Sequence, residues 1–333
     1  MPRIIYMLMG GIALLGVTLE PAVAAEKRVY AVFWDGCTAG CEAFVDVVES
    51  ADIGAEVLVR DARQDKSALP DFVEEARALD ADLVLTYGTS VTLGMAGRLA
   101  DAGDPRFVTD RPLVFMYVAD PFGTGIAESF EHSGRANITG TFNRVPEAVN
   151  IRAMRTFRPD FNHLGMLYHS NEANSLIKVE EMRELSKQMG FKLTALEIDP
   201  DNPGVPDPTI IPERVAQLDA AGVDFIYVGS SNFLRTQRKI FTAAAVEHGL
   251  PVLSPYEEVV RDAKGLVSIA ARAEDVAHKA AEQALKILRD GAVPGDLPIA
   301  RVTDFAYVVS SATAKALGIA PSVSLLTVAE IVD

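Results

Sequence analysis

The sequence is poor in cysteine, tryptophan and basic residues. Its 333 residues include two cysteines and one tryptophan, and 46 acidic residues outnumber 31 basic ones, which gives a formal net charge of -15. A chain without an excess of positive charge has no broad basic face for neutralising phosphates, so we do not expect nucleic acid as a partner. Two cysteines without histidines at ligand spacing form an incomplete ligand set, so we expect neither a metal nor a cofactor.

The common catalytic motifs are also missing from the sequence. It contains no GxSxG nucleophile elbow, no HExxH, no GxxxxGK[ST] loop and no GxGxxG after the first predicted strand. The five histidines are scattered along the chain without the spacing of metal ligands. We therefore predict that the protein is not an enzyme.

The N-terminus has the pattern of a secretory signal peptide. Arg3 precedes an apolar run over residues 4–19, and the small residues Ala22 and Ala24 follow it at the spacing of a signal peptidase site. The run is shorter than the roughly 20 residues of a membrane-spanning helix, which favours cleavage near Ala24 over anchoring. We expect a free, acidic, periplasmic protein.

Short apolar runs alternate with amphipathic stretches through the rest of the chain, which is the pattern of βα units in a parallel sheet. In the first half, strands are predicted at residues 28–34, 55–62, 82–88, 111–118 and 136–142. The series then starts again, with strands predicted at residues 163–169, 192–198, 224–230, 250–255, 265–271 and 305–310. Two similar halves in tandem predict an α/β protein of two lobes. If the long helix predicted at residues 274–291 packs on the first lobe, the chain crosses between the lobes more than once and forms a hinge.

The loop after the third predicted strand is suited to an anionic group. Ligands of parallel α/β sheets gather at the carboxyl ends of strands, where helices begin with unpaired N–H groups. Gly88 lets the backbone approach a ligand, and Thr89 and Ser90 offer hydroxyls beside these amides. A carboxylate would suit this loop, although either hydroxyl would equally serve to cap its own helix.

Three further polar loops follow strands in the two halves. In the turn that contains Asp120 and Pro121, the carboxylate would accept a hydrogen bond from an amine or hydroxyl, or would only stabilise the turn. Similar polar turns recur in the second half, with the candidate residues Asn171, Asn174, Ser175, Ser230, Ser231 and Asn232. Four polar loops that converge from two halves predict a ligand-binding cleft.

These loops also carry a resemblance to a known family. The segments GTSVTLGMAG, VADPFGTGIAESFEHSGRANITG, LGMLYHSNEANSLIKVEEM, DFIYVGSSN, GLPVLSP and AAEQALKILRDG occur in this order. Together they resemble the substrate-binding proteins of ABC transporters related to the tryptophan- and phenylalanine-binding group. The resemblance covers roughly residues 28 to 325.

The resemblance implies the type I periplasmic binding protein fold, in which two Rossmann-like lobes with parallel sheets close on a ligand about a three-segment hinge. The expected division is a signal peptide at 1–24, a first lobe at 25–142 and 270–297, and a second lobe at 143–269 and 298–333. The pockets of this family hold an aromatic amino acid. Carried over by matched motif, the ligand contacts are Thr89, Ser90, Asp120, Asn174, Ser175 and Asn232. Trp34 and Asp35 would line the same cleft, where Trp34 would stack on a flat ligand or serve only in packing.

Two departures from the family pattern bear on the ligand. The chain has Ser230-Ser231-Asn232 where the family often shows Thr-Asp-Asn, and Tyr256 where an aspartate often follows the strand. Both changes remove a carboxylate that would favour a ligand ammonium group. A neutral or carboxylated aromatic compound therefore competes with an aromatic amino acid as the expected ligand, with Tyr256 among the contacts.

The expected function is that of a monomeric periplasmic solute receptor that passes a small organic molecule to the permease of an ABC importer. A sensor subunit that signals to a membrane receptor would use the same fold, and the sequence leaves this alternative open.

Cys37 and Cys41 are expected to form a disulfide because the periplasm is oxidising. On a regular helix the Cβ atoms of residues i and i+4 lie ~5–6 Å apart, beyond the ~3.5–4.5 Å that a disulfide spans. The bond therefore requires a turn, which Gly36 and Gly40 permit, with a helix beginning near Cys41. Such a turn would hold Trp34 and Asp35 at the mouth of the cleft.

Overall fold

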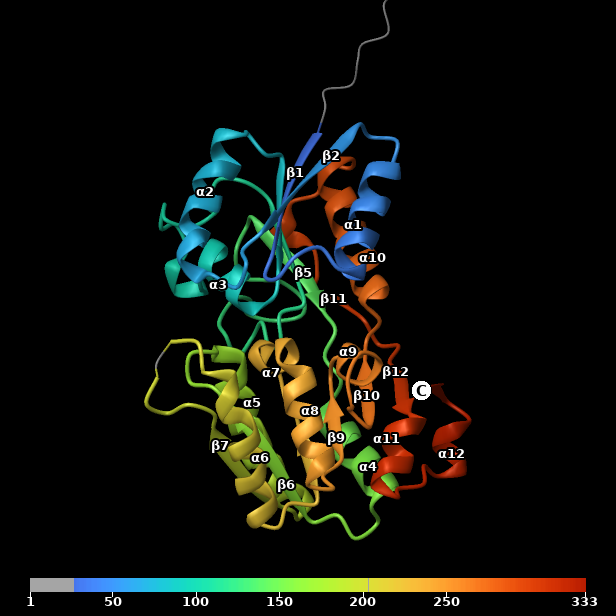
Figure 1. The fold of residues 1–333 in the computed structure, drawn as a ribbon. Coiled ribbons are helices and arrows are strands. Elements are labelled where there is room, and N and C mark those ends of the chain that lie inside the picture. Colours follow the sequence, from blue (N-terminus) through green and yellow to red (C-terminus); the bar gives the residue numbers. More distant parts are fainter. Residues whose placement is uncertain (1–26, 203) are drawn as a thin grey trace, which may run out of the picture.

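The computed structural model describes residues 27–202 and 204–333, so the predicted signal peptide at 1–24 lies outside the described residues. The chain forms two α/β lobes, one above the other in Figure 1, each built on its own sheet. Every strand pairing is parallel except that between β10 and β12. The predicted α/β class and type I periplasmic binding protein architecture are confirmed.

The first lobe holds a six-stranded sheet in the order β11-β5-β4-β3-β1-β2. Its strands are β1 (Lys27–Phe33), β2 (Ala55–Asp61), β3 (Leu83–Tyr87), β4 (Leu113–Met116), β5 (Ile138–Phe142) and β11 (Ala300–Arg301). Its helices are α1 (Ala39–Ser50), α2 (Leu69–Ala78), α3 (Thr89–Ala96) and α10 (Ala273–Leu288). Helices α1 and α10 cover one face of the sheet, and α2 and α3 cover the other.

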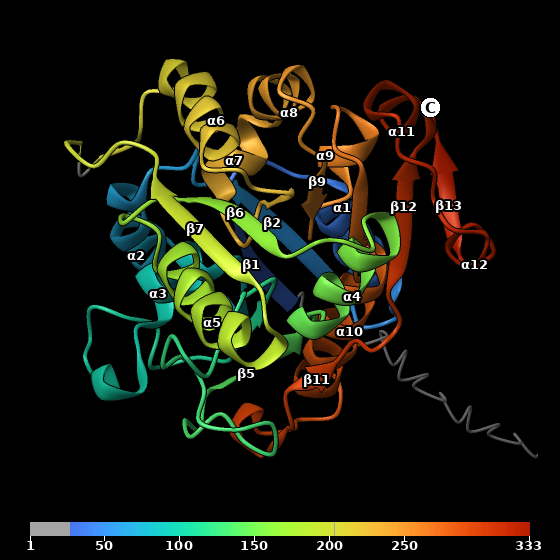
Figure 2. The same cartoon turned by 90° about the horizontal axis from the view of Figure 1, so that it is seen from below.

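The second lobe holds a seven-stranded sheet in the order β13-β12-β10-β9-β8-β6-β7. Its strands are β6 (His163–Tyr168), β7 (Lys192–Glu197), β8 (Phe225–Tyr227), β9 (Val252–Ser254), β10 (Val267–Ala270), β12 (Ala306–Ser310) and β13 (Ala329–Val332). Its helices are α4 (Glu147–Phe157), α5 (Ala173–Met189), α6 (Ile211–Ala220), α7 (Asn232–Thr236), α8 (Arg238–Glu247), α9 (Glu258–Arg261), α11 (Ser311–Leu317) and α12 (Val323–Leu326). Figure 2 shows α4 and α5 on one side of this sheet and α6 and α8 on the other, and the buried residues of the two pairs form separate cores.

Amphipathic spacing explains why α1 and α10 pack where they do. In α1, Cys41, Phe44 and Val48 are buried at helical spacing, and in α10 the buried face includes Val276 and Ala280. These apolar stripes pack against each other and against the first sheet. The long helix α10, which follows the second half of the sequence, thus packs on the first lobe.

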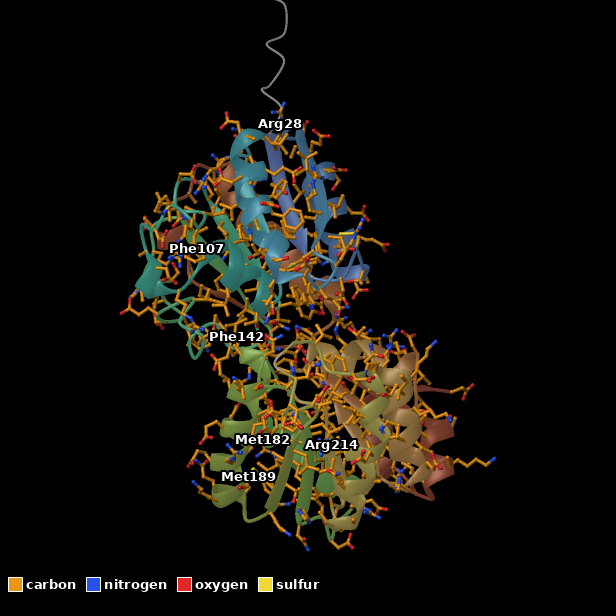
Figure 3. All side chains as sticks on the ribbon, turned by 60° about the vertical axis from the view of Figure 1, so that its left-hand side comes forward. Arg28, Phe107, Phe142, Met182, Met189 and Arg214 are labelled. Atoms are coloured by element: carbon orange, nitrogen blue, oxygen red, sulfur yellow. A yellow bond between two sulfur atoms is a disulfide. The ribbon has the colours of Figure 1, made fainter. Side chains whose placement is uncertain are left out.

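The chain passes between the two sheets three times. The first passage follows Phe142, which lies at the junction of the lobes in Figure 3, and the second follows Ala270. The third was predicted before residue 298, and that boundary is wrong, because Ala300 and Arg301 pair with Thr141 and Phe142 in the first sheet. A strand of two residues carries no periodic pattern by which the sequence would show it.

Candidate functional site

A cleft of about 720 Å³ lies between the lobes, at the carboxyl ends of strands from both sheets. This is where ligands bind in parallel α/β folds. Of the predicted site residues, the cleft wall includes Trp34, Asp35, Gly88, Thr89, Asn174, Asn232 and Tyr256. Ser230 lines a smaller recess that shares Tyr256 and other wall residues with the cleft.

Six other predicted residues line neither cavity: Ser90, Asp120, Pro121, Asn171, Ser175 and Ser231. That they contact the ligand stays a prediction. Asp120 accepts hydrogen bonds from the amides of Phe122 and Gly123, at 3.1 and 2.8 Å, so it stabilises its own turn. Its other carboxylate oxygen lies 3.6 Å from Nη1 of Arg144, in the passage between the lobes.

Two of the three serines among these six, Ser175 and Ser231, have local partners. Oγ of Ser231 accepts a hydrogen bond from the amide of Leu234 at 3.2 Å and caps α7, while its hydroxyl donates to Glu172. Oγ of Ser175 accepts a hydrogen bond from the amide of His169 at 3.3 Å. These hydroxyls stabilise turns and helix starts, which was the alternative interpretation of such residues.

Asn171 has a different role, since it joins the lobes outside the cleft. Nζ of Lys66 in the first lobe donates hydrogen bonds to the backbone oxygen and to Oδ1 of Asn171, at 2.7 and 3.0 Å. A longer hydrogen bond also joins the two lobes, in which Nε2 of Gln64 donates to Oγ1 of Thr236 at 3.4 Å.

The sequence did not reveal two of the aromatic residues in the cleft wall, Tyr87 and Tyr117. Tyr87 ends β3, Tyr117 directly follows the neighbouring strand β4, and their rings stack with centroids 4.7 Å apart. Tyr117 has a φ of 57°, an uncommon conformation for a bulky residue and one found mostly at turns and functional sites. Burial raises the pKa of Tyr87, Tyr117 and Tyr256 above that of free tyrosine, so all three phenols stay protonated at neutral pH.

Arg235 links the two lobes inside the cleft. Its guanidinium pairs with Asp35 of the first lobe, donates to Oε1 of Glu258 at 2.9 Å, and lies 5.6 Å from the ring centre of Tyr256. Burial acts to lower the pKa of Arg235, but the charges of Asp35 and Glu258 outweigh it, and the net pKa is raised. Burial raises the pKa of Asp35 despite its pairing with Arg235.

The start of α3 offers donors to an anionic group. Gly88 has a φ of 90°, which favours glycine, and no side chain caps the helix that follows. Oγ1 of Thr89 accepts a hydrogen bond from the amide of Ala119 at 3.1 Å, so its own proton remains available. The first amides of α3 and the Thr89 hydroxyl therefore form a donor group at the cleft wall.

Asn174 supplies an acceptor on the opposite wall. Its side chain is 3% exposed, and its amide nitrogen donates to the backbone oxygen of Ser230. Its Oδ1 has no hydrogen-bond partner. A buried acceptor without a partner is costly, so this oxygen favours a donor on a bound molecule.

The disulfide between Cys37 and Cys41 is present, as expected. Cys37 lies in the turn before α1, and the helix begins at Ala39, close to the predicted start. The closed loop has a sequence separation of 4, so the chain-entropy model gives it a contribution of only about 2 kcal/mol.

Two further observations concern the class of protein. In residues 27–202 and 204–333, no three histidine, cysteine, aspartate or glutamate side chains gather closely enough to hold a metal ion. Within the same ranges, no helix has the length and apolar character needed to cross a membrane.

Two lobes of this topology around an aromatic and polar cleft define the class of two-lobed solute-binding proteins. Residues 41–332 match the family model described as ABC transporter substrate binding protein, and the chain belongs to this family. The members of the family are solute-binding proteins, so the prediction that the chain is not an enzyme is confirmed. The sensor alternative is not favoured by this match.

Individual relatives agree with this assignment. The chain is 24% identical over 208 residues to a protein named tyrosine-binding protein from Clostridioides difficile, and the match covers 62% of the chain and 57% of that protein. A structure of an ABC domain from Streptococcus pneumonia in complex with L-Trp is 20% identical to this chain, with a TM-score of 0.77. The match covers 93% of this chain and 100% of the chain in that structure. The ligand-free, open structure of a substrate binding protein from Clostridium difficile is 21% identical to this chain, with a TM-score of 0.69. The match covers 92% of this chain and 99% of the chain in that structure. The two structures show that the fold is shared.

Proposed function

We propose that the protein is the periplasmic solute-binding component of an ABC importer, and that its cleft binds an aromatic amino acid or a related aromatic carboxylate. The observation that carries this proposal is the pairing of an aromatic wall with a donor group at the start of α3. Tyr87, Tyr117 and Tyr256 provide flat surfaces for a ring. The α3 amides and Thr89 suit a carboxylate.

The charges in the cleft favour an amino acid over a simple aromatic acid. Asp35 and Glu258 flank the single guanidinium of Arg235, so this group carries one excess negative charge. Together with the unpartnered Oδ1 of Asn174, it would receive an α-ammonium group. The carboxylates missing from the second-lobe loops are thus replaced by Glu258, which lies at the start of α9, and by Asp35 of the first lobe.

The contacts that join the lobes support binding by lobe closure. The Arg235–Asp35 and Lys66–Asn171 pairs hold the walls together, and a ligand that contacts both lobes would add to the stability of the closed form. The closed, monomeric receptor would then dock on a permease. The relative named tyrosine-binding protein and the similar structure in complex with L-Trp support the ligand class.

The Thr89 hydroxyl provides a direct test of the carboxylate position. Thr89→Val keeps the side-chain shape but removes the free proton, and we expect it to weaken binding of L-tryptophan or L-tyrosine about tenfold or more, as for a lost hydrogen bond to a charged group. Isothermal titration calorimetry measures the change.

Ser90→Ala is the matched control, because Ser90 is adjacent in sequence but lines neither cavity. Its affinity should stay within about twofold of the native protein. Equal affinities for Thr89→Val and Ser90→Ala would place the carboxylate elsewhere.

A further inference from the structure

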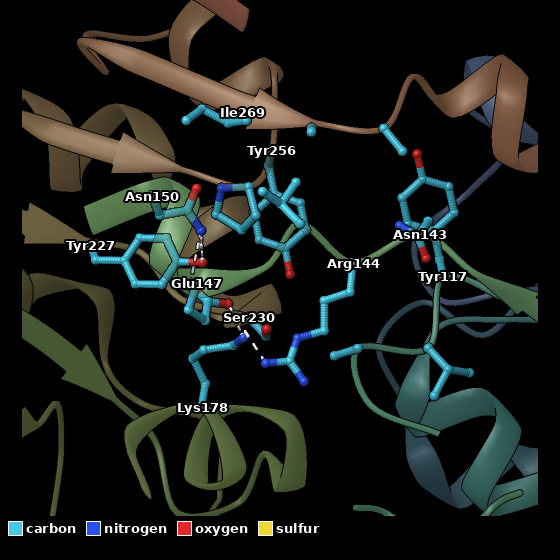
Figure 4. A pocket seen from close by; sticks show the side chains of 16 residues that line it. Tyr117, Asn143, Arg144, Glu147, Asn150, Lys178, Tyr227, Ser230, Tyr256 and Ile269 are labelled. Carbon is cyan, nitrogen blue, oxygen red and sulfur yellow. Dashed lines mark hydrogen bonds and ion pairs between the residues drawn. The ribbon is translucent and has the colours of Figure 1, made fainter. Parts of the chain in front are cut away.

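A small recess opens off the main cleft toward the hinge, and Figure 4 shows the side chains that line it. Its volume is about 70 Å³, and it shares part of its wall with the cleft, including Tyr117, Tyr256 and Ala270. The hinge segments contribute Arg144 and Ala271. A space of this size holds the polar end of a ligand or a few water molecules but not an aromatic ring.

The charged residues that line the recess are Arg144, Glu147 and Lys178, and they pair with one another and with two carboxylates that do not line it, those of Glu181 and Asp120. Lys178 pairs with Glu147 and donates to Glu181 at 3.0 Å, and Arg144 pairs with Glu181. Asp120 lies 3.6 Å from Arg144. Both cations of the recess wall are thus already paired, and an anionic ligand group would find no free positive charge here.

Asn150 leaves one acceptor free in this recess. Its side chain is 1% exposed, and its amide nitrogen donates to Oε2 of Glu147 at 2.9 Å and to the hydroxyl of Tyr227 at 3.2 Å. The Glu147 carboxylate fixes the orientation of the amide, since only the nitrogen side is a donor. Oδ1 of Asn150 has no partner, and in Figure 4 it points away from Glu147, toward Ile269.

We propose that this recess is a specificity subsite that accepts a neutral or cationic hydrogen-bond donor at the far end of the ligand from its carboxylate, with Oδ1 of Asn150 as the acceptor. The inference rests on the proposed function, because the ring must lie in the main cleft between Tyr117 and Tyr256 for its substituent to enter the recess. A ring substituent such as a hydroxyl or an amine satisfies Asn150. A bare ring leaves the oxygen unpaired at a cost.

A series of ring analogues tests the subsite on the unmodified protein. The probes are L-phenylalanine, L-tyrosine, 4-amino-L-phenylalanine, 4-fluoro-L-phenylalanine and 4-carboxy-L-phenylalanine, titrated by calorimetry. We expect the hydroxyl and amino compounds to bind at least about tenfold more tightly than phenylalanine and its fluoro analogue, and the carboxy compound to bind most weakly.

Asn150→Leu should reduce the tyrosine-to-phenylalanine affinity ratio to within about threefold of one, mainly by weakening tyrosine. Asn174→Leu is the matched control, since it removes the unpartnered amide of the main cleft and should weaken both ligands alike while keeping their ratio.

The outcomes separate the two proposals. Equal affinities for tyrosine and phenylalanine in the native protein would overturn the subsite alone and would indicate that water fills the recess. If Asn150→Leu fails to fold, the analogue series still decides. Failure of every aromatic amino acid to bind would overturn the proposed function, and the subsite with it.

Discussion

Lys178→Met is expected to destabilise the protein by about 3–5 kcal/mol, because it removes one partner of a buried ion pair. The side chains of Lys178 and Glu147 are each 4% exposed, and they are paired directly. Burial acts to raise the pKa of Glu147, but the charges of Lys178 and Arg144 outweigh it and hold that pKa below its usual value. Without Lys178 the Glu147 carboxylate would remain buried with only partial compensation from Arg144. Urea unfolding followed by circular dichroism measures the loss.

Two further variants make this prediction specific. Glu147→Leu combined with Lys178→Met removes both charges and should recover most of the lost stability, since apolar replacements of buried pairs are often neutral. Lys187→Met is the matched control on the same helix, because Lys187 is 69% exposed and pairs only at the surface with Glu184. Its effect should stay below about 0.5 kcal/mol. Equal unfolding midpoints for Lys178→Met and Lys187→Met would contradict the structural role of the pair.

Asp35→Asn should raise the dissociation constant of the ligand by about 30-fold or more, since it breaks the charged contact that joins the lobes inside the cleft. Asp35 pairs with Arg235 across the lobes, and the variant leaves a buried guanidinium held by Glu258 alone. Calorimetry measures the affinity. Small-angle X-ray scattering of the ligand-free variant should show a larger radius of gyration, because the open form gains population.

Lys66→Ala separates lobe closure from direct ligand contact. It removes the contact with Asn171, which lies outside the cleft, and so acts on closure alone. We expect a smaller loss of affinity than for Asp35→Asn, together with a shift toward the open form. An unchanged scattering profile and an unchanged affinity in both variants would show that these pairs do not control closure.

Much of the fold could be predicted from the sequence because buried parallel strands are short apolar runs between helices. The exceptions are informative. β11 has two residues, and β13 (Ala329–Val332) lies at the edge of its sheet, so neither shows a distinctive pattern. The third hinge boundary was misplaced for the same reason.

The site was predicted less completely, because a loop position does not determine which way a side chain points. Gly88 and Thr89 reach the cleft, while Ser90, one residue later on α3, does not line it. Arg235 lies within the short helix α7, which begins at Asn232, so it follows the polar turn from which the site was predicted. Tyr87 and Tyr117 resemble core residues of their strands, and only the arrangement of the two lobes shows that they form a ligand wall.

The central claim is that the interlobe cleft binds an aromatic amino acid or a close relative. The most direct measurement is a calorimetric titration of protein that has been unfolded, dialysed and refolded to remove bound molecules. The proposal predicts a micromolar or lower dissociation constant for at least one of L-tryptophan, L-tyrosine and L-phenylalanine, and binding at least about tenfold weaker for L-leucine. Tighter binding of L-leucine or of a short sugar than of any aromatic amino acid would contradict it.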